Sequence, residues 1–253
     1  MDTVTHHGRT TAYRRTDFGD GPRVCYIHGA GGSHDVWVEQ YGDREGPPAV
    51  AVDLSGHGDS DDVDTEPGTE TLDAYADDVV AVCEQTDASV LCGNSMGGAV
   101  ALWVALERDL DLDGLVLADT GAKLGVDEGF RESLARNFEA AIASMHTPDT
   151  LFHEPTDELI EVSKEGLLRT GQAVTVRDFE TCDEFDVRDR LDEITMPALA
   201  LCGEHDPMTP PMFSEFLEAE LPDCEYREIA DAAHMPMLER PDVFNSAVRA
   251  FLA

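Results

Sequence analysis

Short apolar runs recur along this chain, and each is typical of a strand that is buried on both faces of a sheet. The runs cover residues 23–27, 48–52, 88–91, 112–118, 198–202 and 224–229, and a weak alternation at 10–15 predicts a first edge strand. Segments of helical period separate them and predict helices at 35–41, 72–83, 99–106, 187–194, 211–220 and 241–252. This alternation predicts an α/β fold with a mostly parallel central sheet flanked by helices.

The alternation stops between residues 121 and 184, where no clear strand is present. Helical periods at 130–145, 157–168 and 172–182 predict a helical cap inserted into the sheet domain. We therefore expect a core formed by residues 1–120 and 185–253 and a cap formed by residues 121–184. Most apolar residues of the cap are expected to pack against one another, and a minority to line a substrate pocket.

Ser95 lies between the predicted strand 88–91 and the predicted helix 99–106, at the centre of the motif Gly-Asn-Ser-Met-Gly. Gly-x-Ser-x-Gly is the pattern of a sharp strand-to-helix turn that raises a nucleophilic serine. Glycines at 93 and 97 avoid clashes in such a turn, and the N–H of Met96 is left free to bind an oxyanion. The alternative is a plain strand–helix turn with a small polar residue.

Two more candidate groups follow predicted strands late in the chain, Asp206 after 198–202 and His234 after 224–229. A serine hydroxyl is a weak nucleophile at neutral pH and needs an adjacent base, which His234 would supply. Asp206 would orient the imidazole and stabilise its protonated form. Asp119, which follows the strand 112–118, is the alternative acid.

Other polar residues in the loops are expected to have structural roles. Asp53 and His57 lie in the turn 53–60, which we expect their hydrogen bonds to stabilise, and His28 is expected to support the glycine-rich loop 28–33. That loop has neither the glycine spacing of a dinucleotide site nor a P-loop lysine. No histidines or cysteines have a spacing typical of a metal site, so we expect neither metal nor cofactor.

Acidic residues dominate the composition: 53 aspartates and glutamates against 17 lysines and arginines give a formal charge of −36. Such a charge repels nucleic acids and anionic membranes, so we expect neither as a partner. The acids are spread over amphipathic helices and do not form a tail. We interpret them as an adaptation to high salt, where counterions screen self-repulsion, and the composition resembles that of proteins from salt-loving archaea.

The six cysteines include no Cys-x-x-Cys pair, and three of them lie in predicted strands. This usage is typical of a reduced, cytoplasmic protein. The polar N-terminus lacks the apolar core of a signal peptide, and no run approaches the roughly 20 apolar residues of a membrane span.

Five motifs together resemble the α/β-hydrolase superfamily over nearly the full chain, and they lie at residues 28–31, 53–60, 93–98, 203–206 and 234–236. The resemblance implies the triad Ser95, Asp206 and His234, in the chain order of that superfamily. It also places a second oxyanion donor in the loop 28–33. By position this donor is the N–H of Ala30, beside that of Met96, with Gly31 as the alternative.

The resemblance implies hydrolysis of a small carboxylic ester or lactone. Asn94 is similar to its counterpart in carbon–carbon bond hydrolases of ring-cleavage products, but Met235-Pro236-Met237 stands where those enzymes carry a tryptophan. The third possibility is a receptor or regulator of the same fold that binds a small molecule without turnover. The sequence leaves the oligomeric state open.

Overall fold

A single sheet of eight strands runs through the molecule, which is described here as a computed structural model of residues 1–253. In chain order the strands are β1 (Asp2–His6), β2 (Arg9–Thr16), β3 (Arg23–Ile27), β4 (Ala49–Val52), β5 (Ala88–Asn94), β6 (Gly114–Ala118), β7 (Ala198–Gly203) and β8 (Cys224–Ile229). Their order in the sheet is β1-β2-β4-β3-β5-β6-β7-β8. The pairs β1–β2 and β2–β4 are antiparallel, and all other pairs are parallel.

The position of the first strand in the sheet differs from the prediction. The segment 10–15 belongs to β2, which is not an edge strand because β1 pairs with its outer side. The sequence pattern did not predict β1, because this strand holds only one apolar residue, Val4, among polar neighbours. An exposed edge strand of this kind has no buried face and therefore no apolar pattern.

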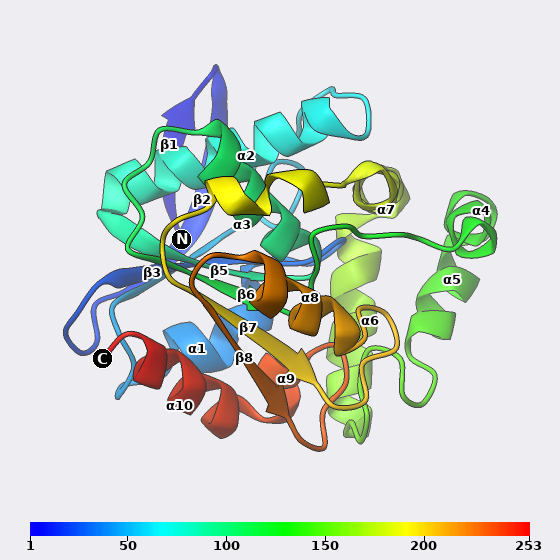
Figure 1. Cartoon of the computed structure of the whole chain (residues 1–253). Helices are drawn as coiled ribbons and strands as arrows, with labels where there is room; N and C mark the ends of the chain where they lie inside the picture. Colours follow the sequence, from blue (N-terminus) through cyan, green and yellow to red (C-terminus); the bar gives the residue numbers. More distant parts are fainter.

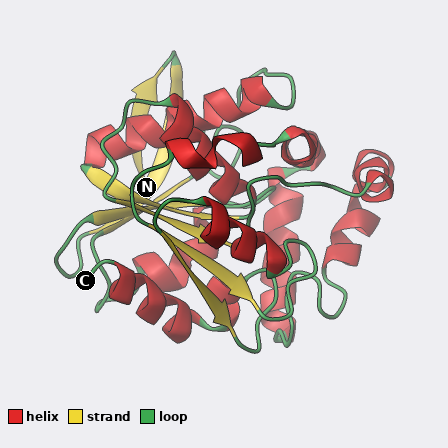
Figure 2. Cartoon of the chain, viewed as in Figure 1, coloured by secondary structure: helices red, strands yellow, loops and turns green.

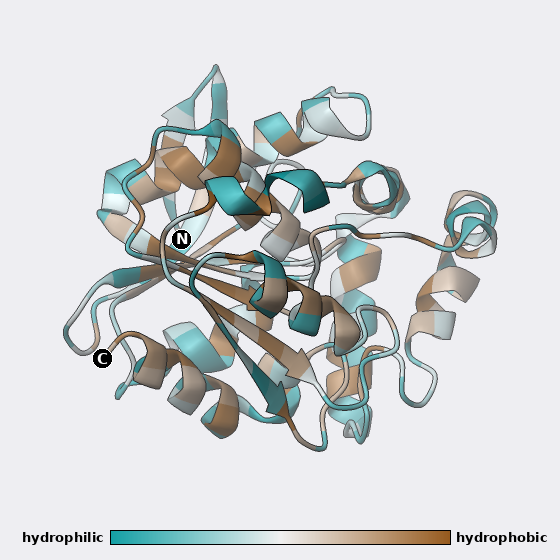
Figure 3. Ribbon diagram, viewed as in Figure 1, coloured by the Kyte–Doolittle hydropathy of each residue, from teal (hydrophilic) through white to brown (hydrophobic).

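Helices cover both faces of the sheet (Figures 1 and 2). On one face lie α2 (Thr69–Thr86), α3 (Met96–Glu107), α8 (Met212–Glu220) and the 3₁₀ helix η2 (Arg188–Glu193). On the other lie η1 (His34–Trp37), α1 (Val38–Tyr41), α9 (Pro236–Glu239) and α10 (Pro241–Phe251). Within the predicted helix 187–194, the structure has the 3₁₀ helix Arg188–Glu193, and Figure 3 shows that this segment is mostly hydrophilic.

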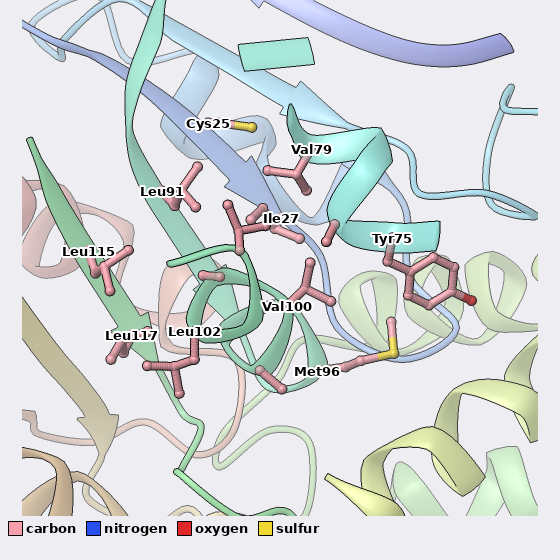
Figure 4. Close-up of a cluster of buried hydrophobic side chains, with 14 of the residues drawn as sticks. Cys25, Ile27, Tyr75, Val79, Leu91, Met96, Val100, Leu102, Leu115 and Leu117 are labelled. Atoms are coloured by element: carbon pink, nitrogen blue, oxygen red, sulfur yellow. The ribbon is translucent and has the colours of Figure 1, made fainter. Parts of the chain in front are cut away.

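The central strands divide their side chains between two cores, as the two-residue period of a strand requires. Cys25 and Ile27 of β3 and Leu115 and Leu117 of β6 join the cluster under α2 and α3 (Figure 4). Their neighbours along the strands join the cluster under α10. Burial on both faces explains why these strands appear in the sequence as continuous apolar runs.

Four α-helices lie between β6 and η2: α4 (Glu128–Arg136), α5 (Phe138–Met145), α6 (Asp157–Thr170) and α7 (Gln172–Glu184). We call them the helical insertion; they lie beside the carboxyl ends of the parallel strands (Figure 1). The prediction of one helix over 130–145 was wrong, because Asn137 leaves the helical conformation at φ −149° and ψ 71°. The insertion has its own cluster of eight buried hydrophobic residues.

None of the helices combines the length and the hydrophobicity that crossing a bilayer requires.

Candidate active site

Ser95 occupies the sharp turn that joins β5 to α3. Its backbone has φ 54° and ψ −120°, a sparsely populated conformation for a residue with a side chain. A Cβ atom on Gly93 would collide with the carbonyl of Gly97, and one on Gly97 with the carbonyl of Ile27. The turn therefore requires the two glycines of the motif, as expected. Because Met96 begins α3, its N–H has no acceptor in the preceding turn of its own helix.

Asp206 and His234 meet at the same edge of the sheet. Nδ1 of His234 lies 2.8 Å from Asp206 Oδ2, and both side chains are buried. With Nδ1–H donated to the carboxylate, the neutral imidazole keeps an unprotonated Nε2. Burial alone would raise the pKa of Asp206, but the charge and hydrogen bond of His234 hold it below the ordinary value.

Thr209 also binds Asp206, and the sequence analysis missed it. Its hydroxyl donates to Asp206 Oδ2 at 2.6 Å, while the N–H groups of Met208 and Thr209 donate to Oδ1 at 2.7 and 3.1 Å. The carboxylate is thereby fixed on both oxygens. The sequence Asp-Pro-Met-Thr at 206–209 could have predicted part of this arrangement. An aspartate in such a turn commonly accepts a hydrogen bond from the N–H two residues later.

Asp119, the alternative acid, has a different environment. One of its oxygens accepts from the N–H of Gly203 at 2.8 Å, and the other has no partner. Its carboxylate lies within 4.8 Å of both the Asp206 carboxylate and Cys202 Sγ. Burial and the neighbouring charge of Asp206 raise the pKa of Asp119 well above its ordinary value. The structure places Asp206, and not Asp119, on His234.

Ser95 and His234 line the same two cavities, of about 330 and 530 Å³. The smaller lies beneath α4 and the larger beside α6, so the helical insertion contributes to both. In this structure the His234 imidazole is bonded to Asp206 through Nδ1, and no hydrogen bond joins it to Ser95 Oγ. In unliganded enzymes the bond between nucleophile and base is often long and tightens when substrate binds.

The glycine-rich loop is fixed from the helical insertion. The N–H of Gly31 donates to Asp178 of α7 at 2.8 Å, and its carbonyl accepts from the Thr170 hydroxyl at 2.8 Å. Because the Gly31 N–H is already bound, the alternative that Gly31 is an oxyanion donor is wrong. Ala30 lines the larger cavity together with Ser95. His28 supports the loop as expected, through Nδ1 to the Gly29 carbonyl at 2.8 Å.

Asp178 is the centre of a buried polar network that the sequence did not reveal. Besides Gly31, it accepts from Nε2 of His57 at 2.8 Å and from the Tyr75 hydroxyl at 2.6 Å. Nδ1 of His57 lies 3.1 Å from the Ser55 carbonyl, so both ring nitrogens face acceptors, an arrangement that favours the protonated imidazole. Burial would lower the pKa of His57, but the Asp178 charge outweighs it and raises that pKa.

Two other groups of side chains have the composition of a metal site. Asp119, Cys202 and Asp206 lie close together, but Asp206 is already committed to His234 and Thr209. The second group, Glu204, His205 and Asp231, lies at the surface and lines neither of the two cavities.

The chain is similar to a known family and to named relatives. The Alpha/beta hydrolase family matches residues 26–247. The 3-oxoadipate enol-lactonase 1 of Acinetobacter baylyi is 26% identical over 95% of this chain and 92% of its own. The pimeloyl-[acyl-carrier protein] methyl ester esterase of Neisseria meningitidis serogroup A is 30% identical over 91% of this chain and 76% of its own.

Solved structures share the fold over almost the whole chain. A thermophilic esterase has a TM-score of 0.87 and 30% identity, with coverage of 99% of this chain and 96% of the other. The enol-lactonase from Burkholderia xenovorans also has a TM-score of 0.87, at 23% identity and 99% coverage of both chains. At that identity the second likeness shows the fold alone.

The buried network around Asp178 predicts a large effect on stability. Asp178→Ala removes the buried carboxylate that pairs with His57 and also leaves the Tyr75 hydroxyl and the Gly31 N–H without their acceptor, so the free energy of unfolding should fall by about 3–5 kcal/mol. Glu180→Ala, on the same helix, breaks the partly exposed ion pair with Arg131 and should cost at most about 1 kcal/mol. Urea unfolding at neutral pH measures both, and equal losses would contradict the prediction.

The same network predicts a pH dependence. The pKa of Asp178 is lowered in the folded state from an ordinary value of 3.8. The stabilisation is therefore present above the ordinary value and is lost as the pH falls through the lower folded one. As the pH falls below about 3.8, the difference in unfolding free energy between the unchanged protein and Asp178→Ala should become smaller.

Proposed function

Because the chain belongs to the alpha/beta hydrolase family, we propose that it is a serine hydrolase acting on a small carboxylic ester or lactone through an acyl-enzyme intermediate. The observation that carries the proposal is the buried His234–Asp206 pair, 2.8 Å apart, at the cavities that Ser95 enters from its strained turn. The proposal also draws on the relatives, which are named as an enol-lactonase and a methyl ester esterase.

In the proposed reaction, Nε2 of His234 takes the proton of Ser95 as Oγ attacks the ester carbonyl carbon. The imidazolium that forms is stabilised by Asp206 and then protonates the departing alcohol oxygen. Water then attacks the acyl carbon while the same imidazole takes its proton. The bond from the acyl carbon to Ser95 Oγ breaks, the imidazolium returns the proton to Oγ, and the acid leaves. With a lactone, the alcohol and the acid are parts of one product.

The oxyanion of each tetrahedral intermediate needs donors that are in place before it forms. We assign this role to the N–H groups of Met96, at the start of α3, and Ala30, in the loop held by Asp178 and Thr170. Removing one such donor typically costs about 3–4 kcal/mol of transition-state stabilisation.

The proposal divides the chain into a hydrolase core of residues 1–120 and 185–253 and a cap of residues 121–184. The separate hydrophobic cluster of the helical insertion supports this division. In this scheme the cap closes over Ser95 and determines which substrates fit, because it contributes to both cavities.

The proposed nucleophile is tested by covalent labelling. A reactive organophosphate should add one phosphoryl group at Ser95, and hydrolysis of 4-nitrophenyl butyrate should fall by at least about 10⁴-fold in Ser95→Ala. Mass spectrometry of the peptide that contains Ser95 measures the label. A protein that neither turns over the ester nor takes the label would instead be a binding protein of the same fold.

The assignment of the acid predicts different effects at the two buried aspartates. Asp206→Asn should lower kcat by about 10⁴-fold, because the amide no longer fixes the imidazole tautomer. Asp119→Asn keeps the shape of a side chain that makes no hydrogen bond to His234, so kcat should change by less than about tenfold. Steady-state kinetics of both folded variants measure kcat. A larger loss of kcat in Asp119→Asn than in Asp206→Asn would assign the role of the triad acid to Asp119.

We also propose that this protein works in a cytoplasm of high salt. The formal charge of −36 supports this, as do the six cysteines, all of them free and five of them buried. Screening of the acidic surface should raise the free energy of unfolding as KCl increases from about 0.1 to 1 M, where the Debye length falls from about 10 to 3 Å. A free energy of unfolding, measured with urea, that does not change with the KCl concentration would contradict the proposed adaptation to high salt.

A further inference from the structure

The two cavities at Ser95 differ in what they offer to a bound group. We call them the α4 cavity, of about 330 Å³, and the α6 cavity, of about 530 Å³. When the ester bond of a substrate lies at Ser95, its acyl and alcohol portions extend away from that residue. Each cavity is large enough to bind one of these portions.

Apolar side chains make up half of the residues that line the α4 cavity. Phe130 of α4 and Phe179 of α7 pack edge to face, with ring centroids 5.1 Å apart. Leu124, Val126 and Phe213 extend this surface. Such a wall favours a hydrocarbon group, whose burial releases water from both surfaces.

Hydroxyl groups line the same cavity, but their protons are already donated within the chain. Ser144 donates to the Ala141 carbonyl at 2.7 Å, and Thr209 donates to Asp206. Thr147 gives its proton to the Ser144 carbonyl, so in the 3.0 Å contact between Thr147 and Thr150 it is Thr150 that donates. Apart from the proposed nucleophile Ser95, none of the lining hydroxyls has a proton left for a substrate anion.

Charge in the α4 cavity is also unfavourable to an anion. Its one charged side chain is Asp127, the N-cap of α4, which accepts from the Phe130 N–H at 2.9 Å. The helix N-terminus, which would otherwise attract an anion, is therefore already capped by a carboxylate. The N–H of Val126 is bound to Asp183 at 3.0 Å.

The α6 cavity has one cation among three acids. Arg169 lines it together with Asp35, Glu39 and Glu158. The guanidinium lies 3.8 Å from the Asp35 carboxylate, and its side chain is 68% exposed. An anion beside Arg169 would remain in solvent and compete with Asp35.

We infer that this site selects esters and lactones whose acyl and alcohol portions are both uncharged, with a hydrocarbon group in the α4 cavity, and discriminates against substrates that end in a carboxylate. The inference rests on the proposed serine hydrolase function. Its basis is physical: a carboxylate that loses its water must find a cation or hydrogen-bond donors, and the α4 cavity is lined by no lysine or arginine while its Ser144, Thr150 and Thr209 hydroxyls already donate within the chain.

Three methyl esters of equal chain length test the inference: methyl hexanoate, monomethyl adipate, and its neutral terminal amide. They differ only at the far end of the acyl chain, which is methyl, carboxylate or carboxamide. Assays in at least about 1 M KCl reduce the Debye length to about 3 Å, so that repulsion from the distant acidic surface is screened. The amide separates the effect of charge from that of polarity.

We expect kcat/KM for monomethyl adipate to be at least about 100-fold below that for methyl hexanoate, with the amide between them. Phe130→Arg, which adds a cation at the cavity, should raise the adipate-to-hexanoate ratio at least about tenfold, whereas Phe130→Met should not. Asp127→Asn keeps a good N-cap and should raise the ratio by a smaller factor.

Equal or faster hydrolysis of monomethyl adipate would overturn the inference, and a loss of that activity in Arg169→Gln would assign the carboxylate to the α6 cavity. Failure of the proposed function gives a different result. In that case none of the three esters is hydrolysed, 4-nitrophenyl butyrate is not turned over, and Ser95 takes no organophosphate label.

Discussion

The backbone of Ser95 is held in a conformation that residues with side chains rarely adopt, at a cost of about 1–3 kcal/mol. Close packing of backbone against backbone maintains it, because a side chain at Gly93 or Gly97 would strike a neighbouring carbonyl. The Ser95 N–H is also bound to the Ala118 carbonyl at 3.0 Å, and its own carbonyl to the Thr120 hydroxyl at 2.8 Å. The hydroxyl and the start of α3 are thereby positioned together, and the proposed chemistry depends on that placement.

The helical insertion lines the cavities and also fixes the glycine-rich loop. Asp178 and Thr170 hold opposite ends of one residue, Gly31, in the loop that carries Ala30. Asp178 is in turn bound to His57 and Tyr75 of the core. Buried ion pairs of this kind contribute little net stability compared with apolar packing, but removal of one partner is costly. We interpret the network as a fixed connection between the helical insertion and the glycine-rich loop that carries Ala30.

Much of the fold and of the site follows from short-range patterns in the sequence. The central strands were predictable because burial on both faces leaves a continuous apolar run, and Ser95 because its turn permits only glycine at 93 and 97. The order of Asp206 and His234 after later strands was predictive because parallel strands bring their carboxyl ends to one edge of the sheet.

Features that depend on long-range contacts gave no such signal. β1 has no buried face, so its polar residues resemble those of a loop. Asp178 lies on a helix among other acidic residues, and only the fold brings it to His57, 121 residues earlier in the chain. The break at Asn137 was missed because the apolar period continues in α5 after the interruption.

The proposed mechanism requires Ser95, His234 and Asp206 to act together beside the N–H groups of Met96 and Ala30. A crystal structure of the protein inactivated by a phosphonate ester tests it most directly. We expect phosphorus bonded to Ser95 Oγ, with the phosphonyl oxygen about 2.7–3.1 Å from both backbone nitrogens and His234 still bound to Asp206. A phosphonyl oxygen directed away from Met96 and Ala30, or an imidazole turned from Ser95 in the adduct, would contradict it.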